Sequence, residues 1–344
     1  MNFDKQIISA GPLPDESEGM PEGELSAETR QLYFPEVAHG RRLDQVLAEQ
    51  VPEFSRSYLQ QLIIQGAVTL NGRVALKPSA RLKAGDTGTV ELRATPQSQA
   101  FRPEPMHLQI CHSDDHLLVI DKPAGLVVHP APGNWSGTLL NGLLAQDAAC
   151  AALPRAGIVH RLDKNTSGLM VVARTRVAMD ALVRAISQHD VGREYLALAH
   201  RPWQGELRRE VDRPIGRDPA TRLRMAIVDL ERHSGKNART DIELLANAPM
   251  GCLVRCTLHT GRTHQIRVHL ASLGHALVAD ELYGGRPAAG MERQALHAFR
   301  LSLDHPVTGE RLAFTSGLPK DFSNALQQWG LGYNFRHDLG RDLA

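Results

Sequence analysis

Several features are missing from this sequence, and each absence excludes a class of protein. No run of apolar residues approaches the roughly 20 that a membrane-spanning helix needs, so we expect no membrane segment. The first residues hold no basic stretch followed by an apolar one, so we expect no signal peptide. Neither a GxGxxG motif nor a phosphate-binding GxxxxGKS or GxxxxGKT motif occurs, which argues against a nucleotide cofactor.

Cysteine is also scarce. The four cysteines are Cys111, Cys150, Cys252 and Cys256, and no two of them form a CxxC motif. Cys252 and Cys256 lie in an apolar run, which predicts buried free thiols. A chain with neither a disulfide framework nor a secretion signal is typical of the cytoplasm.

Histidine recurs at a spacing that does not suit a metal site. His259, His264 and His269 are five residues apart. Five residues turn a helix by about 140°, and on a strand an odd spacing changes the face. We therefore expect no metal ion at these residues.

Charge is distributed unevenly along the 344 residues. Residues 1–38 carry eight acidic and two basic side chains and few large apolar ones, which predicts a disordered acidic tail. Residues 39–95 carry eight basic and five acidic side chains. The length permits two domains, and a basic body behind an acidic tail is compatible with an RNA ligand.

Residues 39–93 have the pattern of a small independent domain. Apolar residues recur at helical spacing from Leu43, and Ser55 is a suitable N-cap for a second helix. Asn71-Gly72 predicts a tight hairpin turn after a short strand. The Pro- and Gln-containing segment that follows, residues 94–105, is typical of a linker.

This arrangement resembles the S4 RNA-binding domain. The resemblance implies a small α/β module in which three arginines contact RNA phosphates: Arg41, Arg42 and Arg56. On the residues alone, a helical mini-domain with ordinary surface arginines stays open as an alternative.

The most distinctive stretch is GIVHRLDKNTSGLMVVART, residues 157–175. Turn-forming residues follow Asp163, and residues 169–173 form a short apolar run typical of a buried strand. We therefore expect Asp163 on a loop just ahead of a rigid strand, which would hold an accessible carboxylate still. A turn aspartate that caps its own backbone is the alternative.

This stretch resembles the signature of the RluA family of RNA pseudouridine synthases, in which HRLD precedes a polar turn and an apolar run. The matching residues are His160, Arg161, Leu162, Asp163, Thr166, Ser167 and Gly168. The resemblance implies that Asp163 is the catalytic nucleophile and that His160 contacts RNA. It also implies that Arg161 fills the space left when the target uridine leaves its stack.

The segment DKPAGLVVHPAPGN, residues 121–134, resembles the first motif of this family. Lys122, beside a Pro-Gly turn, is a candidate phosphate contact. The part HPAPGN, residues 129–134, is most like the branch that modifies a stem-loop of 23S rRNA in the large ribosomal subunit. Large-subunit rRNA is therefore the expected partner, with other 23S rRNA sites or tRNA as the alternative.

The segment LHTGRTHQIRVHLASL, residues 258–273, resembles another family motif. We expect Thr263 to cap a helix in which Arg267 lies at the edge of the buried stripe. The resemblance implies that Arg267 pairs with Asp163. It also implies RNA contacts by two neighbours, Arg262 and His264.

Tyr195 follows Arg193-Glu194 at the start of a predicted strand. On the residues alone, a half-buried strand aromatic is the simpler interpretation. The resemblance implies instead that Tyr195 holds the target base. Two further basic residues are expected to face RNA: Arg217 and Lys236.

The resemblance spans residues 40–320 and implies an α+β fold. Residues 106–320 would form a catalytic domain with a mixed, largely antiparallel sheet, followed by a tail, residues 321–344. The implied reaction breaks the N1–C1′ bond of a uridine, turns the base over and joins C5 to C1′. It needs no cofactor, and whether Asp163 attacks C1′ or C6 stays open.

Two other classes of function also stay open. A glycosidase that releases free uracil would typically need two carboxylates, and the motifs supply only Asp163. A non-catalytic RNA-binding assembly factor would use the S4-like unit alone. For the synthase we expect a monomer.

Overall fold

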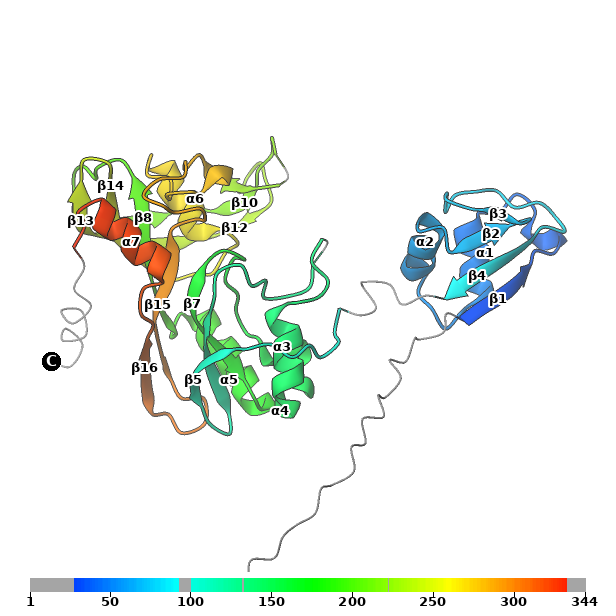
Figure 1. The fold of residues 1–344 in the computed structure, drawn as a ribbon, viewed down its shortest axis with the longest axis horizontal. Coiled ribbons are helices and arrows are strands. Elements are labelled where there is room, and N and C mark those ends of the chain that lie inside the picture. Colours follow the sequence, from blue (N-terminus) through cyan, green and yellow to red (C-terminus); the bar gives the residue numbers. More distant parts are fainter. Residues whose placement is uncertain (1–27, 93–99, 132, 222, 333–344) are drawn as a thin grey trace, which may run out of the picture. The chain divides into compact units, whose positions relative to one another are not determined.

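The computed structural model describes residues 28–92, 100–131, 133–221 and 223–332. The chain divides into two compact units, Met1–Thr95 and Pro96–Ala344 (Figure 1). In the described part of the chain, no helix is both long and apolar enough to span a membrane.

The N-terminal unit packs two helices against an antiparallel sheet with the strand order β1-β4-β2-β3. Its elements are β1 (Glu28–Tyr33), η1 (Glu36–Ala38), α1 (Leu43–Gln50), α2 (Arg56–Ile64), β2 (Val68–Leu70), β3 (Arg73–Val74) and β4 (Thr87–Leu92). Ser55 caps α2 as expected, because its hydroxyl accepts the Tyr58 N–H. Asn71 and Gly72 both have positive φ, as the predicted tight turn between β2 and β3 requires.

Part of the expected acidic tail belongs to this unit. β1 pairs with β4 along its whole length, and Leu32 and Phe34 are buried in the core. The prediction of disorder is therefore wrong for residues 28–38. Acidic composition suggested a tail, but pairing with a strand far along the chain decided the structure. The rest of the predicted tail, residues 1–27, lies outside the described residues.

The C-terminal unit is built on one large sheet with the strand order β5-β6-β7-β15-β8-β14-β13-β9, and β16 pairs with β15. β7 and β15 are parallel and the other neighbours are antiparallel, which confirms the expected mixed, largely antiparallel sheet. The strands are β5 (Gln109–Ser113), β6 (Leu117–Lys122), β7 (Ser167–Ala173), β8 (Gly192–His200), β9 (Arg208–Asp212), β13 (Arg239–Ala248), β14 (Gly251–Leu258), β15 (Leu296–Asp304) and β16 (Arg311–Thr315). A small separate sheet, ordered β11-β10-β12, contains β10 (Ile215–Arg217), β11 (Met225–Ile227) and β12 (Gly235–Lys236).

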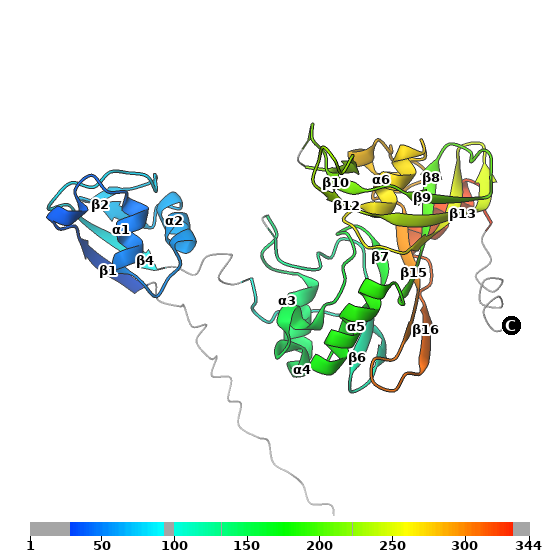
Figure 2. The same cartoon turned by 180° about the vertical axis from the view of Figure 1, so that it is seen from behind.

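Helices cover both faces of the large sheet. They are α3 (Leu139–Gln146), α4 (Ala148–Ala151), α5 (Arg176–Gln188), α6 (Gln265–Ser272) and α7 (Lys320–Gln328), with short 3-10 helices η2 (Pro154–Gly157) and η3 (Glu281–Tyr283). Alternate residues of each strand face opposite sides, so one face packs against α3 and α6 and the other against α5 and α7. In both views β7 and β15 lie in the middle of the unit, with α3 to α5 at one end and α6 at the other (Figures 1 and 2).

Two predicted boundaries of this unit are wrong. The expected C-terminal tail contains most of α7, whose Phe322, Ala325 and Leu326 are buried at the i, i+3, i+4 spacing of an amphipathic helix. The end of the expected linker also packs on this unit, because the buried Asn141 side chain donates to the carbonyl of Ala100. Residues 93–99 and 333–344 lie outside the described part.

Candidate active site

Asp163 lies on the loop that leads into β7, as expected. The Thr166 N–H donates to the Asp163 carbonyl at 3.1 Å and closes the turn. β7 is buried along its whole length and runs beside β15. Gly168 permits this close approach, because its φ is +113° and a Cβ there would lie 2.1 Å from the Ala298 carbonyl oxygen. The loop of Asp163 is thereby fixed to the centre of the sheet.

Arg267 projects from α6 to the Asp163 carboxylate. Its Nη1 lies 3.1 Å from Asp163 Oδ2, so the pair expected from the sequence is present. The other side of the same guanidinium donates two hydrogen bonds of 2.8 Å to Asp280. The ring of Tyr283 lies under the guanidinium, 4.9 Å away. Arg267 is therefore held on three sides, and its orientation toward Asp163 is fixed.

The charge of Arg267 is stabilised in a dry environment. Burial alone would lower its pKa, but the hydrogen bonds and charges of Asp280 and Asp163 outweigh burial and raise it. Arg267 therefore places a permanent positive charge beside the Asp163 carboxylate. An ionised carboxylate is the form that can act as a nucleophile.

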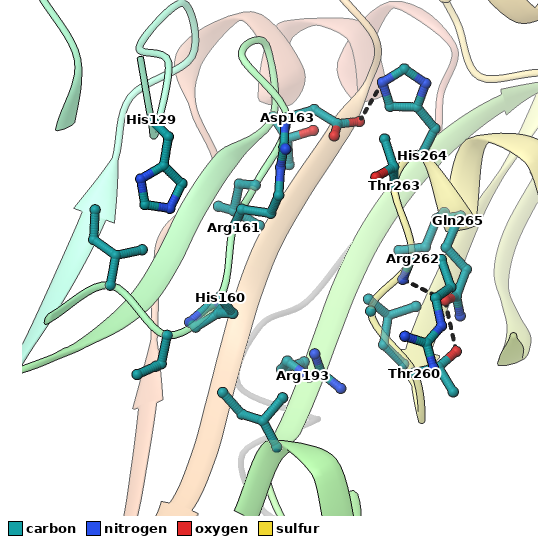
Figure 3. Close-up of a pocket in the computed structure, with 18 of the residues that line it drawn as sticks. His129, His160, Arg161, Asp163, Arg193, Thr260, Arg262, Thr263, His264 and Gln265 are labelled. Carbon is teal, nitrogen blue, oxygen red and sulfur yellow. Dashed lines mark hydrogen bonds and ion pairs between the residues drawn. The ribbon is translucent and has the colours of Figure 1, made fainter. Parts of the chain in front are cut away.

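His264 approaches the same oxygen of the Asp163 carboxylate as Arg267 does. Its Nε2 lies 3.9 Å from Asp163 Oδ2, and its Nδ1 is 2.8 Å from the Tyr283 hydroxyl (Figure 3). Burial lowers the pKa of His264. The ring is therefore expected to be neutral at pH 7 and to orient the site by hydrogen bonding rather than by charge.

The start of α6 differs from the prediction in one detail. Thr263 does not cap the helix, which begins at Gln265 after His264 adopts a left-handed conformation with φ of 57°. The Gln265 side chain accepts from the Arg262 N–H at 3.0 Å and from the Thr260 hydroxyl at 2.7 Å instead. The loop before α6 is thus folded onto the first residue of the helix.

Asp163, His264 and Arg267 border one cavity of about 780 Å³. Of the residues expected to act in catalysis or RNA binding, its lining contains Asp163, Tyr195, Arg267, His160, Arg161, Arg262 and His264. Tyr195, on β8, is almost fully buried, and burial raises the pKa of its phenol to about 12. The His160 Nε2 accepts the Val171 N–H at 3.0 Å, and burial lowers the pKa of His160 to about 3, so this ring is neutral.

Lys122 was expected to contact a phosphate, and this prediction is wrong. Its side chain is fully buried, and Nζ donates to the carbonyls of Pro123, Leu126 and Lys164 at 2.8, 2.9 and 3.1 Å. Three acceptors match the three N–H groups of an ammonium. Burial nevertheless lowers the pKa of Lys122 to about 7. Lys122 therefore ties the loop after β6 to the loop that carries Asp163.

The other predicted RNA contacts lie outside the cavity. Arg217 and Lys236 are exposed at the ends of β10 and β12. In the N-terminal unit, Arg41 pairs with Glu49, and Arg42 and Arg56 both donate to Asp44. These three arginines are therefore held by carboxylates within their own unit.

Three residues of the site were not predicted from the sequence. Asp280 and Tyr283 fix Arg267 and His264, and Arg193 lines the cavity. Asp280 is 13 residues from Arg267, and no spacing rule connects the two. For Arg193, alternation along β8 offered a signal, because residues two apart on a strand share a face and Tyr195 was already predicted to act in the site.

Comparison with known proteins gives a family for both units. Residues 116–272 match the family model described as RNA pseudouridylate synthase, and residues 41–87 match the S4 domain. The first match contains Asp163, Tyr195 and Arg267.

The chain is also similar to curated proteins named ribosomal large subunit pseudouridine synthase D. The protein of Neisseria meningitidis serogroup B is 46% identical over 308 residues, which cover 86% of this chain and 80% of that one. The protein of Xanthomonas campestris is 45% identical, with 88% and 93% covered, and that of Escherichia coli O6:H1 is 39% identical, with 84% and 90% covered.

One solved structure supports the fold. Human RNA pseudouridylate synthase domain containing 4 is 26% identical and superposes with a TM-score of 0.51, covering 65% of this chain and 94% of that one. The relatives match over most of their own length as well as most of this one. The chain therefore belongs to the RNA pseudouridylate synthase family.

Proposed function

We propose that this enzyme converts uridine to pseudouridine in the RNA of the large ribosomal subunit, with Asp163 as the nucleophile. The observation that carries the catalytic role is the 3.1 Å contact between Asp163 and a fixed Arg267 inside the cavity. The support for the target is that relatives at 39–46% identity are named as large-subunit synthases. A cytoplasmic monomer would suit such a substrate.

In this proposal the Asp163 carboxylate attacks the target uridine, and the N1–C1′ bond breaks. The base turns over within the cavity and C5 bonds to C1′. The bond between Asp163 and the nucleotide then breaks and restores the free carboxylate, and the proton lost from C5 is balanced by one gained at N1. The phenol of Tyr195, which stays protonated near neutral pH, would pack against the base and steer it. A cavity of about 780 Å³ lies within the roughly 300–1,000 Å³ range of sites that enclose small ligands.

The test of the catalytic role is Asp163→Asn, which keeps the shape of the side chain and removes its charge. The single-turnover rate should fall by roughly three orders of magnitude or more, while RNA affinity changes little. Nucleotide analysis of the RNA separates pseudouridine from free uracil and unchanged uridine. Turnover within tenfold of the unmodified protein would refute the assignment, and release of uracil would identify a glycosidase.

The test of the target is a map of pseudouridines in rRNA and tRNA from cells that lack the gene. Loss confined to a large-subunit stem-loop would support the proposal. Such a loop exposes uridines that are easily extruded, while phosphate contacts fix the register on the stem. Loss only in tRNA would move the enzyme to another substrate class.

A further inference from the structure

Arg193 is a second buried arginine in the cavity wall, and neither the motifs nor the pair with Asp163 explains it. It lies on β8 two residues before Tyr195, on the same face of the strand. Only 5% of its surface is exposed. Figure 3 shows its side chain across the cavity from His160, directed toward Arg262 and Thr260.

The guanidinium of Arg193 lacks a counter-ion. Among the described residues, no carboxylate forms an ion pair with it, and its buried Nε has no hydrogen-bond partner. Its Nη2 makes one long hydrogen bond, 3.5 Å to the His259 carbonyl. Arg267, by contrast, is neutralised by two carboxylates.

An uncompensated buried cation is costly, and burial lowers the pKa of Arg193. Arginine nevertheless remains protonated in proteins, so the charge persists. The rest of the cavity lining adds three more arginines: Arg155, Arg161 and Arg262. The one carboxylate in that lining is Asp163, which already pairs with Arg267. The positive charge of the cavity is therefore left for a ligand to neutralise.

A backbone phosphate of RNA has the chemistry to do so. Any uridine that reaches Asp163 carries a phosphate on each side within an RNA chain, and a guanidinium binds phosphate oxygens with two parallel N–H donors. Gly261 leaves room for this group, because a Cβ there would lie 2.9 Å from Arg193 Nη1. We propose that Arg193 is a phosphate-binding residue that holds the backbone next to the target uridine; this rests on the proposed function of the cavity.

The test combines Arg193→Gln with hairpin RNAs in which one phosphate at a time near the target uridine is a neutral methylphosphonate. With the unmodified protein, one such linkage should weaken binding by roughly 10- to 100-fold, as for a lost charge-assisted hydrogen bond. Arg193→Gln should weaken binding of the normal RNA by a similar factor. The variant should bind the RNA with that neutral linkage no more weakly than it binds the normal RNA. Arg193→Lys should recover part of the affinity for the normal RNA.

The matched control is Arg311→Gln, an exposed arginine paired with Asp304 on the β15–β16 hairpin, which should change neither affinity nor phosphate dependence. The proposal fails if the loss of affinity from Arg193→Gln multiplies with the loss from every neutral linkage. The two effects would then be independent, and Arg193 would only support the neighbouring loop. It also fails if the unmodified protein is indifferent to all linkages near the target. Nucleotide analysis of the same RNAs separates this failure from failure of the proposed function, which would appear as binding without pseudouridine.

Discussion

At the scale of single residues, the position of Asp163 depends on side chains that do not line the cavity. Asp280 is almost fully buried and accepts two hydrogen bonds from Arg267, whose third guanidinium nitrogen, Nη1, faces Asp163. Lys122 holds the loop of Asp163 through the Lys164 carbonyl. Asp280 and Lys122 are positioning residues, because they act through Arg267 and through the backbone.

Asp280→Asn should lower the single-turnover rate by roughly 10- to 100-fold, since the guanidinium loses a charged partner and its fixed orientation. RNA affinity should stay within a few-fold, because Asp280 lies behind Arg267. The rate at saturating RNA measures the first effect and a binding titration the second. Asp304→Asn, in an exposed Asp–Arg pair, is the control and should leave both unchanged. An unaltered rate in Asp280→Asn would mean that Tyr283 and Asp163 suffice to orient Arg267.

At the scale of elements, the helices of the N-terminal unit are joined by a buried carboxylate. Asp44, in the first turn of α1, accepts hydrogen bonds from Arg42, Arg56 and Gln60. Burial alone would raise the pKa of Asp44, but these three donors outweigh it and hold the pKa below its ordinary value. The arginines expected to bind phosphate thus also connect α1 to α2.

Asp44→Asn should lower the free energy of unfolding of this unit by about 1.5–3 kcal/mol at pH 7, as for a lost charged hydrogen bond. The folded pKa lies below the ordinary value near ~3.9, so the stabilisation is present above that value and is lost as pH falls through the folded pKa. Urea unfolding of residues 1–95, monitored by circular dichroism from pH 7 to pH 2, measures both the loss of stability at pH 7 and its dependence on pH. The free energies of unfolding of the two proteins should differ at pH 7 and become equal in acid. A difference that stays constant with pH would contradict the linkage between stability and the protonation of Asp44.

α7 is an element of the core rather than a tail. Phe322→Ala should lower the free energy of unfolding of the catalytic unit by about 3–5 kcal/mol, because a fully buried ring is replaced by a cavity. Gln327→Ala, on the exposed side of the same helix, should change it by less than about 0.5 kcal/mol. Denaturant unfolding compares the two. If both substitutions change the free energy of unfolding by equally small amounts, residues 320–328 are a tail and not part of the core.

At the scale of the whole molecule, every residue of the cavity belongs to the unit Pro96–Ala344. We therefore expect the S4 unit to add affinity for RNA rather than chemistry. Deletion of residues 1–95 should weaken RNA binding and reduce its salt dependence, by about one unit of logarithmic slope per lost phosphate contact. The single-turnover rate at saturating RNA should stay within a few-fold. An unchanged slope would show that the arginines of this unit do not contact RNA.

The sequence alone determined the structural features that depend on residues close together in the chain. Ser55 caps the helix that follows it, Asn71-Gly72 turns a hairpin, and the apolar run after Asp163 becomes a buried strand. Each of these outcomes rests on interactions within a few residues, so local pattern was sufficient. The motifs also identified Asp163, Tyr195 and Arg267, which the fold brings to one cavity.

Only the tertiary structure decided the environment of each charge. A lysine beside a turn and an arginine at a strand start look accessible in sequence, yet Lys122 meets a carbonyl 42 residues away and Arg193 faces a cavity without a counter-ion. Asp280 likewise matters only because the fold places it behind Arg267. The physical reason is that the free energy of a charged group depends on solvent and on the groups within a few ångströms. For buried charges, those groups come from distant parts of the chain.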